Sequence, residues 1–139
     1  SPGPQEAAQD KGVYSIGYNT DMSKFAPKAH LTAPIWNWAP FYTQTVEQVR
    51  SGSWKSASAW MGMKEGMVDL APFGPMVPED VRAKVMAKKL AIIDGSAKLF
   101  AGPVKDQKGA VQVPAGKVAT DEELLNMKYF VQGVTGTLE

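Results

Sequence analysis

Strand-like runs alternate with helical patterns along this chain, and this alternation limits the fold class more than any other feature. Residues 5–10 have the composition of the end of a helix, and Gly12 suits its C-terminal stop. The apolar run 13–17 then predicts a short strand. A helix followed by a strand is typical of a chain that builds an α/β sheet. We therefore predict an α/β fold.

The rest of the chain supports this class. Residues 31–35 predict a strand that Pro34 restricts to a sheet edge or a bend. Pro40 fits the first turn of a helix that ends at Gly52, with apolar residues from Phe41 to Val49 facing a core. The further predicted elements are a hairpin of strands 56–61 and 67–71 around the turn 64–66, a helix from Pro78 to about residue 94, a second hairpin of 100–105 and 110–113, a capped helix from Thr120 to Met127, and a last strand 129–131.

Composition and charge exclude several classes of protein. The 139 residues suit one domain of ordinary size. Lys and Arg number 15 against 14 Asp and Glu, so the net charge of +1 gives no case for binding nucleic acid or an anionic membrane. Cys is absent, which excludes disulfides and thiolate chemistry. No run approaches the ~18 consecutive apolar residues of a membrane span.

Catalytic and metal-binding patterns are missing from the sequence. His30 is the only histidine, and one His without Cys cannot form a usual zinc site. No nucleophile elbow surrounds a Ser, and the glycines form neither a P-loop nor a dinucleotide fingerprint. His30 lies in a loop rich in Pro and Lys, so we expect it at the surface. The sequence therefore predicts a binding protein without enzymatic activity, cofactor or metal.

A cluster of aromatic residues is the strongest candidate for a binding site. Four aromatic rings fall between Trp36 and Tyr42, and Trp36 and Trp38 would point to the same side of an extended chain. Two such rings, with the amide of Asn37 between them, are suited to a planar ligand whose edge carries a donor and an acceptor. Packing of both rings in the core is an equally open interpretation.

Polar residues after the first predicted strand form a second candidate. Asn19 follows the strand 13–17, and ligands of open α/β sheets bind beyond the carboxyl ends of the strands. Asn, Thr and Asp are also common turn residues, so a simple turn at 19–21 is the commoner interpretation.

Several blocks of the sequence resemble the basic membrane protein family. These are the run LTAPIWNWAPFYTQTVEQVRSGSW followed by WMGMKEGMVDLAPFG, and the blocks GVYSIGYNTDMSKFAP, FAGPVKDQKG and ELLNMKYFVQGVTG. They cover nearly the whole chain and follow the order of the C-terminal part of the family. Its members are substrate-binding proteins of ABC importers, many of which bind purine bases or nucleosides.

The resemblance implies a portion of a type I periplasmic-binding-protein fold, in which two Rossmann-like α/β lobes joined by hinge crossovers close on a ligand. By this resemblance residues 1–28 belong to the second lobe, 29–56 supply a strand and a helix of the first, and 57–139 return through the hinge to the second. The implied partners are a small-molecule ligand and an ABC transporter permease. The implied location is periplasmic, or extracytoplasmic and membrane-anchored as a lipoprotein.

The resemblance also assigns roles to individual positions. Asn19 stands where nucleoside binders often carry an Asp that holds sugar hydroxyls, and Trp36 stands where a Lys or an acidic residue often contacts the ligand. The amide at position 19 argues against recognition of a ribose, and Trp36 implies a less polar or more base-like ligand. Trp38 matches an aromatic residue of relatives that include nucleobase binders, and Trp60 precedes a turn near the hinge. The candidate ligand-binding residues are Asn19, Trp36, Trp38, Asn37, Tyr18 and Trp60.

Two alternatives and one further expectation accompany this prediction. A sugar-binding relative on the same fold would use the same rings and amides. An interaction domain without a small ligand would use its Met and aromatic residues as a partner surface. Family members are longer and their lobes are interleaved, so we expect a missing N-terminal segment, or an oligomer that exchanges elements, to cover the helix 40–51.

Overall fold

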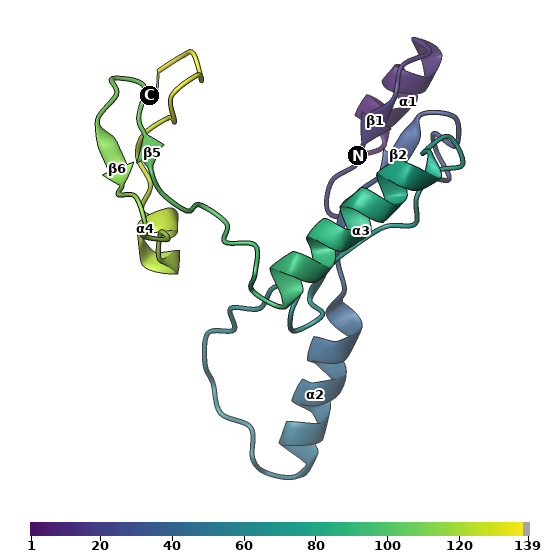
Figure 1. The fold of residues 1–139 in the computed structure, drawn as a ribbon. Helices are drawn as coiled ribbons and strands as arrows, with labels where there is room; N and C mark the ends of the chain where they lie inside the picture. The colour runs from purple at the N-terminus through teal and green to yellow at the C-terminus, as the bar shows by residue number, and fades with distance from the viewer. Residues whose placement is uncertain (138–139) are drawn as a thin grey trace. The chain divides into compact units, whose positions relative to one another are not determined.

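The computed structural model describes residues 1–137, which form two compact units, Ser1–Asp94 and Gly95–Glu139 (Figure 1). Each unit mixes helices with small sheets. The first unit contains α1 (Gly3–Asp10), β1 (Ser15–Ile16), β2 (His30–Thr32), β3 (Pro34–Trp36), α2 (Trp38–Arg50), β4 (Val68–Leu70) and α3 (Glu79–Ile93). The second contains β5 (Val104–Lys105), β6 (Val111–Val113) and α4 (Asp121–Leu125).

Two strand pairs organise the first unit. β1 runs parallel to β2, and β3 runs antiparallel to β4, with Trp36 opposite Val68. Ala33, which is fully buried, separates β2 from β3, so the strand predicted over 31–35 is present but broken just before Pro34. A parallel bridge from Asn19 to Ile35 joins the end of the first strand segment to β3.

The hairpin predicted around residues 64–66 is wrong. The turn itself forms, because the Glu65 carboxylate accepts the Gly62 N–H at 2.8 Å and Gly66 adopts a φ of +75°. The segment 51–61, however, contains no strand and forms an open loop beside α2 in Figure 1. β4 pairs with β3 instead, because strand pairing is decided by which edge lies nearby and not by sequence proximity.

Most of the helices and strands predicted for the second unit are present in the structure. β5 and β6 form the predicted antiparallel hairpin in shortened form. The capping box is present, since the Thr120 hydroxyl accepts the Glu123 N–H at 3.2 Å and the Glu123 carboxylate accepts the Thr120 N–H at 2.7 Å. The strand predicted at 129–131 is wrong: Val131 makes only an isolated bridge with Asp106.

The three longer helices begin and end where the sequence indicates. In α2, Pro40 lies in the first turn, where the N–H groups have no partner within the helix, and Gly52 follows the last turn with a φ of +71°. In α3, Pro78 is the N-cap residue and acidic side chains occupy the first turn. Much of the apolar face of α2 is exposed: Tyr42, Val46 and Val49 are each more than half exposed.

The core of the first unit is built from small residues around one histidine. Ala26, Ala29, Ala33 and Ala71 are almost fully buried, and His30 is only 1% exposed. The expectation of a surface position for His30 is therefore wrong. The ring is buried because the polar groups of Gln5 and Asp21 lie beside its nitrogens. The composition of the surrounding loop gave no indication of these two partners.

Gly74 is expected to be essential for closing this core. A Cβ at that position would lie 2.0 Å from the His30 carbonyl oxygen, so the backbone would have to move. Gly74→Ala should lower the free energy of unfolding by about 1–3 kcal/mol or more, measured by urea denaturation. Gly62→Ala is the matched control, because its Cβ would make only an ordinary 3.7 Å contact with Glu65. Equal stability of the two variants would contradict this account.

An ion pair between β4 and α3 predicts a pH-dependent contribution to stability. Lys89 donates to Asp69, and this hydrogen bond lowers the pKa of the carboxyl below its ordinary value of 3.8. A lowered folded-state pKa means that the stabilisation is complete above the unfolded pKa and is lost as the pH falls through the folded value. Because Asp69 is 41% exposed, Asp69→Asn should cost only about 0.5–1 kcal/mol at neutral pH.

In thermal unfolding experiments, the difference between wild type and Asp69→Asn should shrink towards zero as the pH falls below 3.8 and through the lowered folded-state pKa of Asp69. Asp80→Asn removes the exposed pair with Lys84 and serves as the control, with an expected effect below about 0.5 kcal/mol at any pH. A cost of Asp69→Asn that does not change with pH would show that the charge of Asp69 is irrelevant.

Candidate functional site

An apolar cavity of about 420 Å³ lies where β3, α2, β4 and the end of the open loop 51–61 meet. Its volume lies within the range of small-molecule pockets. Aromatic and thioether side chains dominate its wall. The lining residues are Trp36, Trp38, Phe41, Ala59, Trp60, Met61, Met67 and Val68.

The aromatic rings of this cavity are arranged in a chain of contacts. Trp36 ends β3 and Trp38 begins α2, and their ring centroids are 6.2 Å apart at an interplanar angle of 34°. Trp38 also stacks on Tyr42 at 5.8 Å and 25°, and meets the edge of Phe41 at 6.3 Å. The two Trp rings therefore share one side of the chain, as predicted, although the backbone turns from strand to helix between them.

The three Trp rings of the cavity are partly exposed. Trp36 is 44% exposed, Trp38 is 47% exposed and Trp60 is 66% exposed. Rings packed in a core would be buried, whereas these three rings line a cavity and keep part of their surface open. Such half-open aromatic walls are suited to stacking against a planar group.

The polar candidates lie beside the cavity and not among its lining residues. The Asn37 amide donates to the Gly66 carbonyl at 3.2 Å, and the Asn37 backbone N–H donates to Met67 at 2.8 Å. Asn37 thus fastens the start of α2 to the turn before β4. One of its two amide N–H donors is engaged in this contact.

Asn19 is joined to the aromatic site through the backbone. Its carbonyl accepts the Trp36 N–H at 3.2 Å, and its φ of +63° is a left-handed conformation that Asn tolerates well. Its neighbour Tyr18 is 75% exposed. The structure therefore brings Trp36, Trp38 and Trp60 together at one cavity and links Asn19 to Trp36 through the backbone, while Asn37 bonds to the turn before β4.

Several lining residues were not predicted from the sequence. Phe41 was expected in a core, and Met61, Met67 and Val68 were expected in strands of a hairpin. Their place in the cavity follows from the pairing of β3 with β4, which puts Val68 opposite Trp36. A local pattern carries no signal for that pairing.

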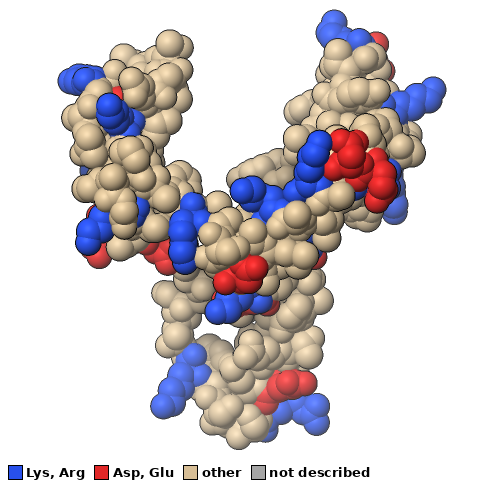
Figure 2. Space-filling model, in the orientation of Figure 1, with Lys and Arg blue, Asp and Glu red and all other residues tan. Residues whose placement is uncertain are grey.

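Charged side chains of both signs lie on the face of the molecule in view (Figure 2). Figure 2 shows acidic and basic side chains interspersed over the face in view, without a continuous area of one sign. Within residues 1–137, no cluster of three or more His, Asp or Glu side chains is arranged to hold a metal ion. None of the helices in this range is long and apolar enough to cross a membrane.

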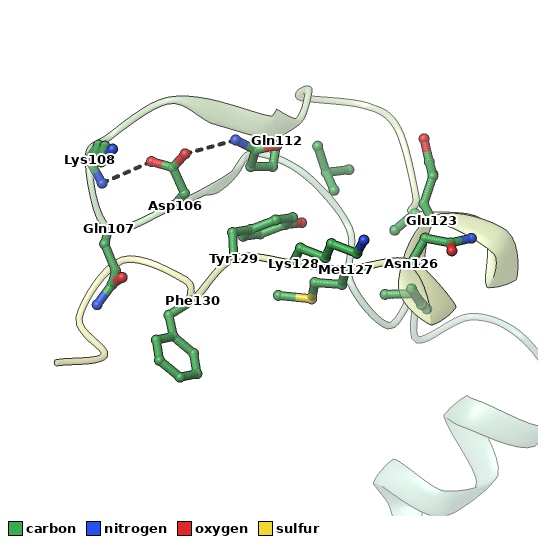
Figure 3. Close-up of a pocket in the computed structure, with 13 residues that line it drawn as sticks. Asp106, Gln107, Lys108, Gln112, Glu123, Asn126, Met127, Lys128, Tyr129 and Phe130 are labelled. Carbon is green, nitrogen blue, oxygen red and sulfur yellow. Dashed lines mark hydrogen bonds between the residues drawn. The ribbon is translucent and has the colours of Figure 1, made fainter. Parts of the chain in front are cut away.

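A second cavity of about 700 Å³ lies within the second unit, between the β5–β6 hairpin and α4 (Figure 3). Its acidic groups are occupied by internal contacts. Asp106 accepts from the backbone of Lys108 and Ala110 and from the Gln112 amide, and the Gln112 bond is the main cause of its lowered pKa. Glu123 is held in the capping box. These side chains stabilise the hairpin and the helix.

Comparison with known proteins shows which family this chain resembles. Residues 1–107 match the family model Bmp, described as ABC transporter substrate-binding protein PnrA-like. A purine-binding protein from Brucella abortus is 41% identical over 133 residues, which are 96% of this chain and 38% of that protein. A putative ABC transporter glucose-binding protein from Haloferax volcanii is 35% identical over 137 residues, which are 98% of this chain and 32% of that protein.

A solved structure agrees with the fold. The crystal structure of a transcriptional activator of the comK gene from Bacillus halodurans superimposes with a TM-score of 0.61 over 67% of this chain and 33% of that one, at 24% identity. The chain spans less than two-fifths of the length of these relatives. The helices and small sheets described above are accordingly a portion of the α/β periplasmic-binding-protein fold, and the chain belongs to the Bmp family of PnrA-like ABC transporter substrate-binding proteins.

Proposed function

We propose that this protein is the solute-binding component of an ABC importer and that its ligand is a purine base or nucleoside. The observation that carries the proposal is the cavity lined by Trp36, Trp38 and Trp60 in a chain of this family. The similarity to a purine-binding protein supports the choice of ligand. The protein would release its ligand to a permease and act outside the cytoplasm, in the periplasm or anchored to a membrane.

Stacking supplies most of the binding in this proposal. The purine ring lies against Trp36 or Trp38, because their faces are half open and tilted by only 34° to each other. The wall of the cavity is almost wholly apolar, which favours a flat heteroaromatic ring over a ligand with many hydroxyls. Asn19 and Tyr18 approach the edge of the ligand from the neighbouring loop, and Asn37 keeps Trp38 in place.

The same proposal assigns the parts of the chain to two lobes. Residues 1–28 and 57–139 are assigned to the second lobe and 29–56 to the first, with the ligand between them. A segment that precedes this chain, or a second copy, would cover the exposed face of α2. That face is apolar, so its burial would stabilise whichever assembly provides the cover.

A sugar is the second candidate ligand. One relative is named a putative glucose-binding protein, and Trp rings stack on the apolar face of a pyranose as they do on a base. A sugar, however, needs several polar partners for its hydroxyls, and the wall described here supplies few of them. Without a small ligand, the same rings would serve as a partner surface, which is the third alternative.

Replacing the stacking ring should weaken ligand binding strongly. We expect Trp36→Ala or Trp38→Ala to reduce the affinity for adenine, guanine, hypoxanthine or their nucleosides by ~1–3 kcal/mol in calorimetry with the complete protein. Trp54→Ala is the matched control, because Trp54 has similar exposure and lies outside the cavity lining. Binding of common sugars alone would contradict the purine assignment, and unchanged affinity in both variants would contradict the stacking role.

The residue at position 19 should decide between a base and a nucleoside. Asn19→Asp restores the carboxylate that nucleoside-binding relatives often carry, and Asp tolerates the observed left-handed backbone. The variant should bind a nucleoside about tenfold more tightly relative to the free base, because a carboxylate accepts hydroxyl hydrogen bonds more strongly than an amide does. An unchanged ratio of the two affinities would place Asn19 outside the ligand site.

A further inference from the structure

His30 occupies an unusual position for a histidine in a protein without catalytic or metal chemistry. The side chain is 1% exposed and lies at the start of β2, among α1, the loop after β1 and the loop after β4. Two glycines lie nearby: a Cβ on Gly17 would make only an ordinary 3.6 Å contact with the ring, whereas a Cβ on Gly74 would collide with the His30 carbonyl. The backbone at His30 therefore requires a glycine at position 74.

Both ring nitrogens of His30 face oxygen atoms. Nδ1 lies 3.4 Å from Gln5 Oε1, which also accepts the Ser15 hydroxyl at 2.8 Å. Nε2 lies 3.6 Å from Asp21 Oδ1 and has no hydrogen-bond partner within residues 1–137. A neutral imidazole carries one N–H and can serve one of these oxygens, whereas the imidazolium carries two and can serve both.

Asp21 connects His30 to the proposed ligand loop. Its Oδ1 accepts the Ser23 N–H at 2.8 Å, and this bond, followed by smaller contributions that include His30, lowers the pKa of the carboxyl. Two residues earlier, the Asn19 carbonyl accepts the Trp36 N–H. The segment 18–21 is thus held at one end by Trp36 of the aromatic cavity and at the other by the carboxylate that faces His30.

We propose that His30 is a positioning residue that holds the segment 18–21 against β3 through Asp21, more tightly in its protonated form than in its neutral form. Its role in ligand binding rests on the proposed function. The groups around the ring are those expected if the protonated form holds the segment more tightly. α1 contributes the neutral Gln5, and the loop after β4 contributes the backbone of Gly74. The loop before β2 contributes Asp21, on whose charge Lys24 also acts. Protonation therefore adds an attraction to Asp21.

Amide hydrogen exchange measures the position of this segment without any ligand. The Trp36 N–H, which is bonded to Asn19, reports on the segment, and the Ala71 N–H, which is bonded to Ala33, reports on the same unit away from it. In the wild type, the protection of Trp36 relative to Ala71 should fall about two- to fivefold when the pH is raised from about 5 to about 8.

The variants separate positioning from general stability. Asp21→Asn keeps the acceptor for Ser23, and His30→Gln keeps a polar side chain that does not titrate. Both should lower the relative protection of Trp36 at low pH and abolish its pH dependence, whereas the exposed control Asp10→Asn should do neither. A parallel loss of protection at Trp36 and Ala71, or a pH dependence that persists in Asp21→Asn, would overturn the proposal.

Calorimetry with the complete protein then tests the link to the ligand. Asp21→Asn should weaken purine binding about two- to fivefold at low pH and remove its pH dependence. Normal affinity in that variant, together with the expected exchange behaviour of Trp36, would overturn the role of His30 in binding. If the wild type binds no purine, the proposed function fails, while the exchange experiment still decides whether His30 positions the segment.

Discussion

The pairing of β3 with β4 joins two parts of the chain that are far apart in sequence, and the aromatic cavity depends on it. Trp36 lies opposite Val68, the Asn37 N–H donates to Met67, and the Asn37 amide donates to Gly66. These contacts tie the start of α2 to the turn before β4. Without them, Trp36 and Trp38 would have no wall of Met67 and Val68 to face, and the two rings would project from a loop into water.

The core behind this pairing is small and partly polar. Alanines fill most of it, and its largest fully buried side chain is a histidine whose neighbours are an amide and a carboxylate. Larger apolar residues such as Val46 and Val49 of α2 remain exposed. A core of alanines allows close approach of the strands and loops, but it buries little apolar area, so individual polar contacts and glycine positions matter more than usual for stability.

The nature of the cavity supports the proposed binding role. The wall is aromatic and apolar, the nearby Glu65 carboxylate is engaged in a turn, and no metal-ligand cluster occurs in residues 1–137. Such a site can exclude water and stack against a flat ligand, but it offers no activated nucleophile or acid–base pair. The ligand would then be recognised by shape and stacking first, with the loop that carries Tyr18 and Asn19 adding polar selectivity.

Local features were determined by the sequence alone. The ends of α2 and α3, the capping box at Thr120 and the turn at Gly66 depend on the intrinsic preferences of Pro, Thr, Glu and Gly, which act within a few residues. The spacing of Trp36 and Trp38 likewise predicted rings on one side of the chain. The resemblance of the sequence blocks to the family also pointed to the fold that the comparisons show.

The tertiary structure decided the strand pairings and the burial that depend on residues far away in the sequence. Residues 56–61 have the pattern of a strand but find no edge to pair with, while Trp60 reaches the cavity from an irregular loop. His30 has the sequence context of a surface loop, yet Gln5 and Asp21 make its burial possible. Asn37 was predicted as a ligand contact, and the carbonyl of Gly66 takes one of its two amide N–H donors. In each case the outcome depends on a partner that sequence periodicity does not specify, because pairing and burial are properties of the assembled chain.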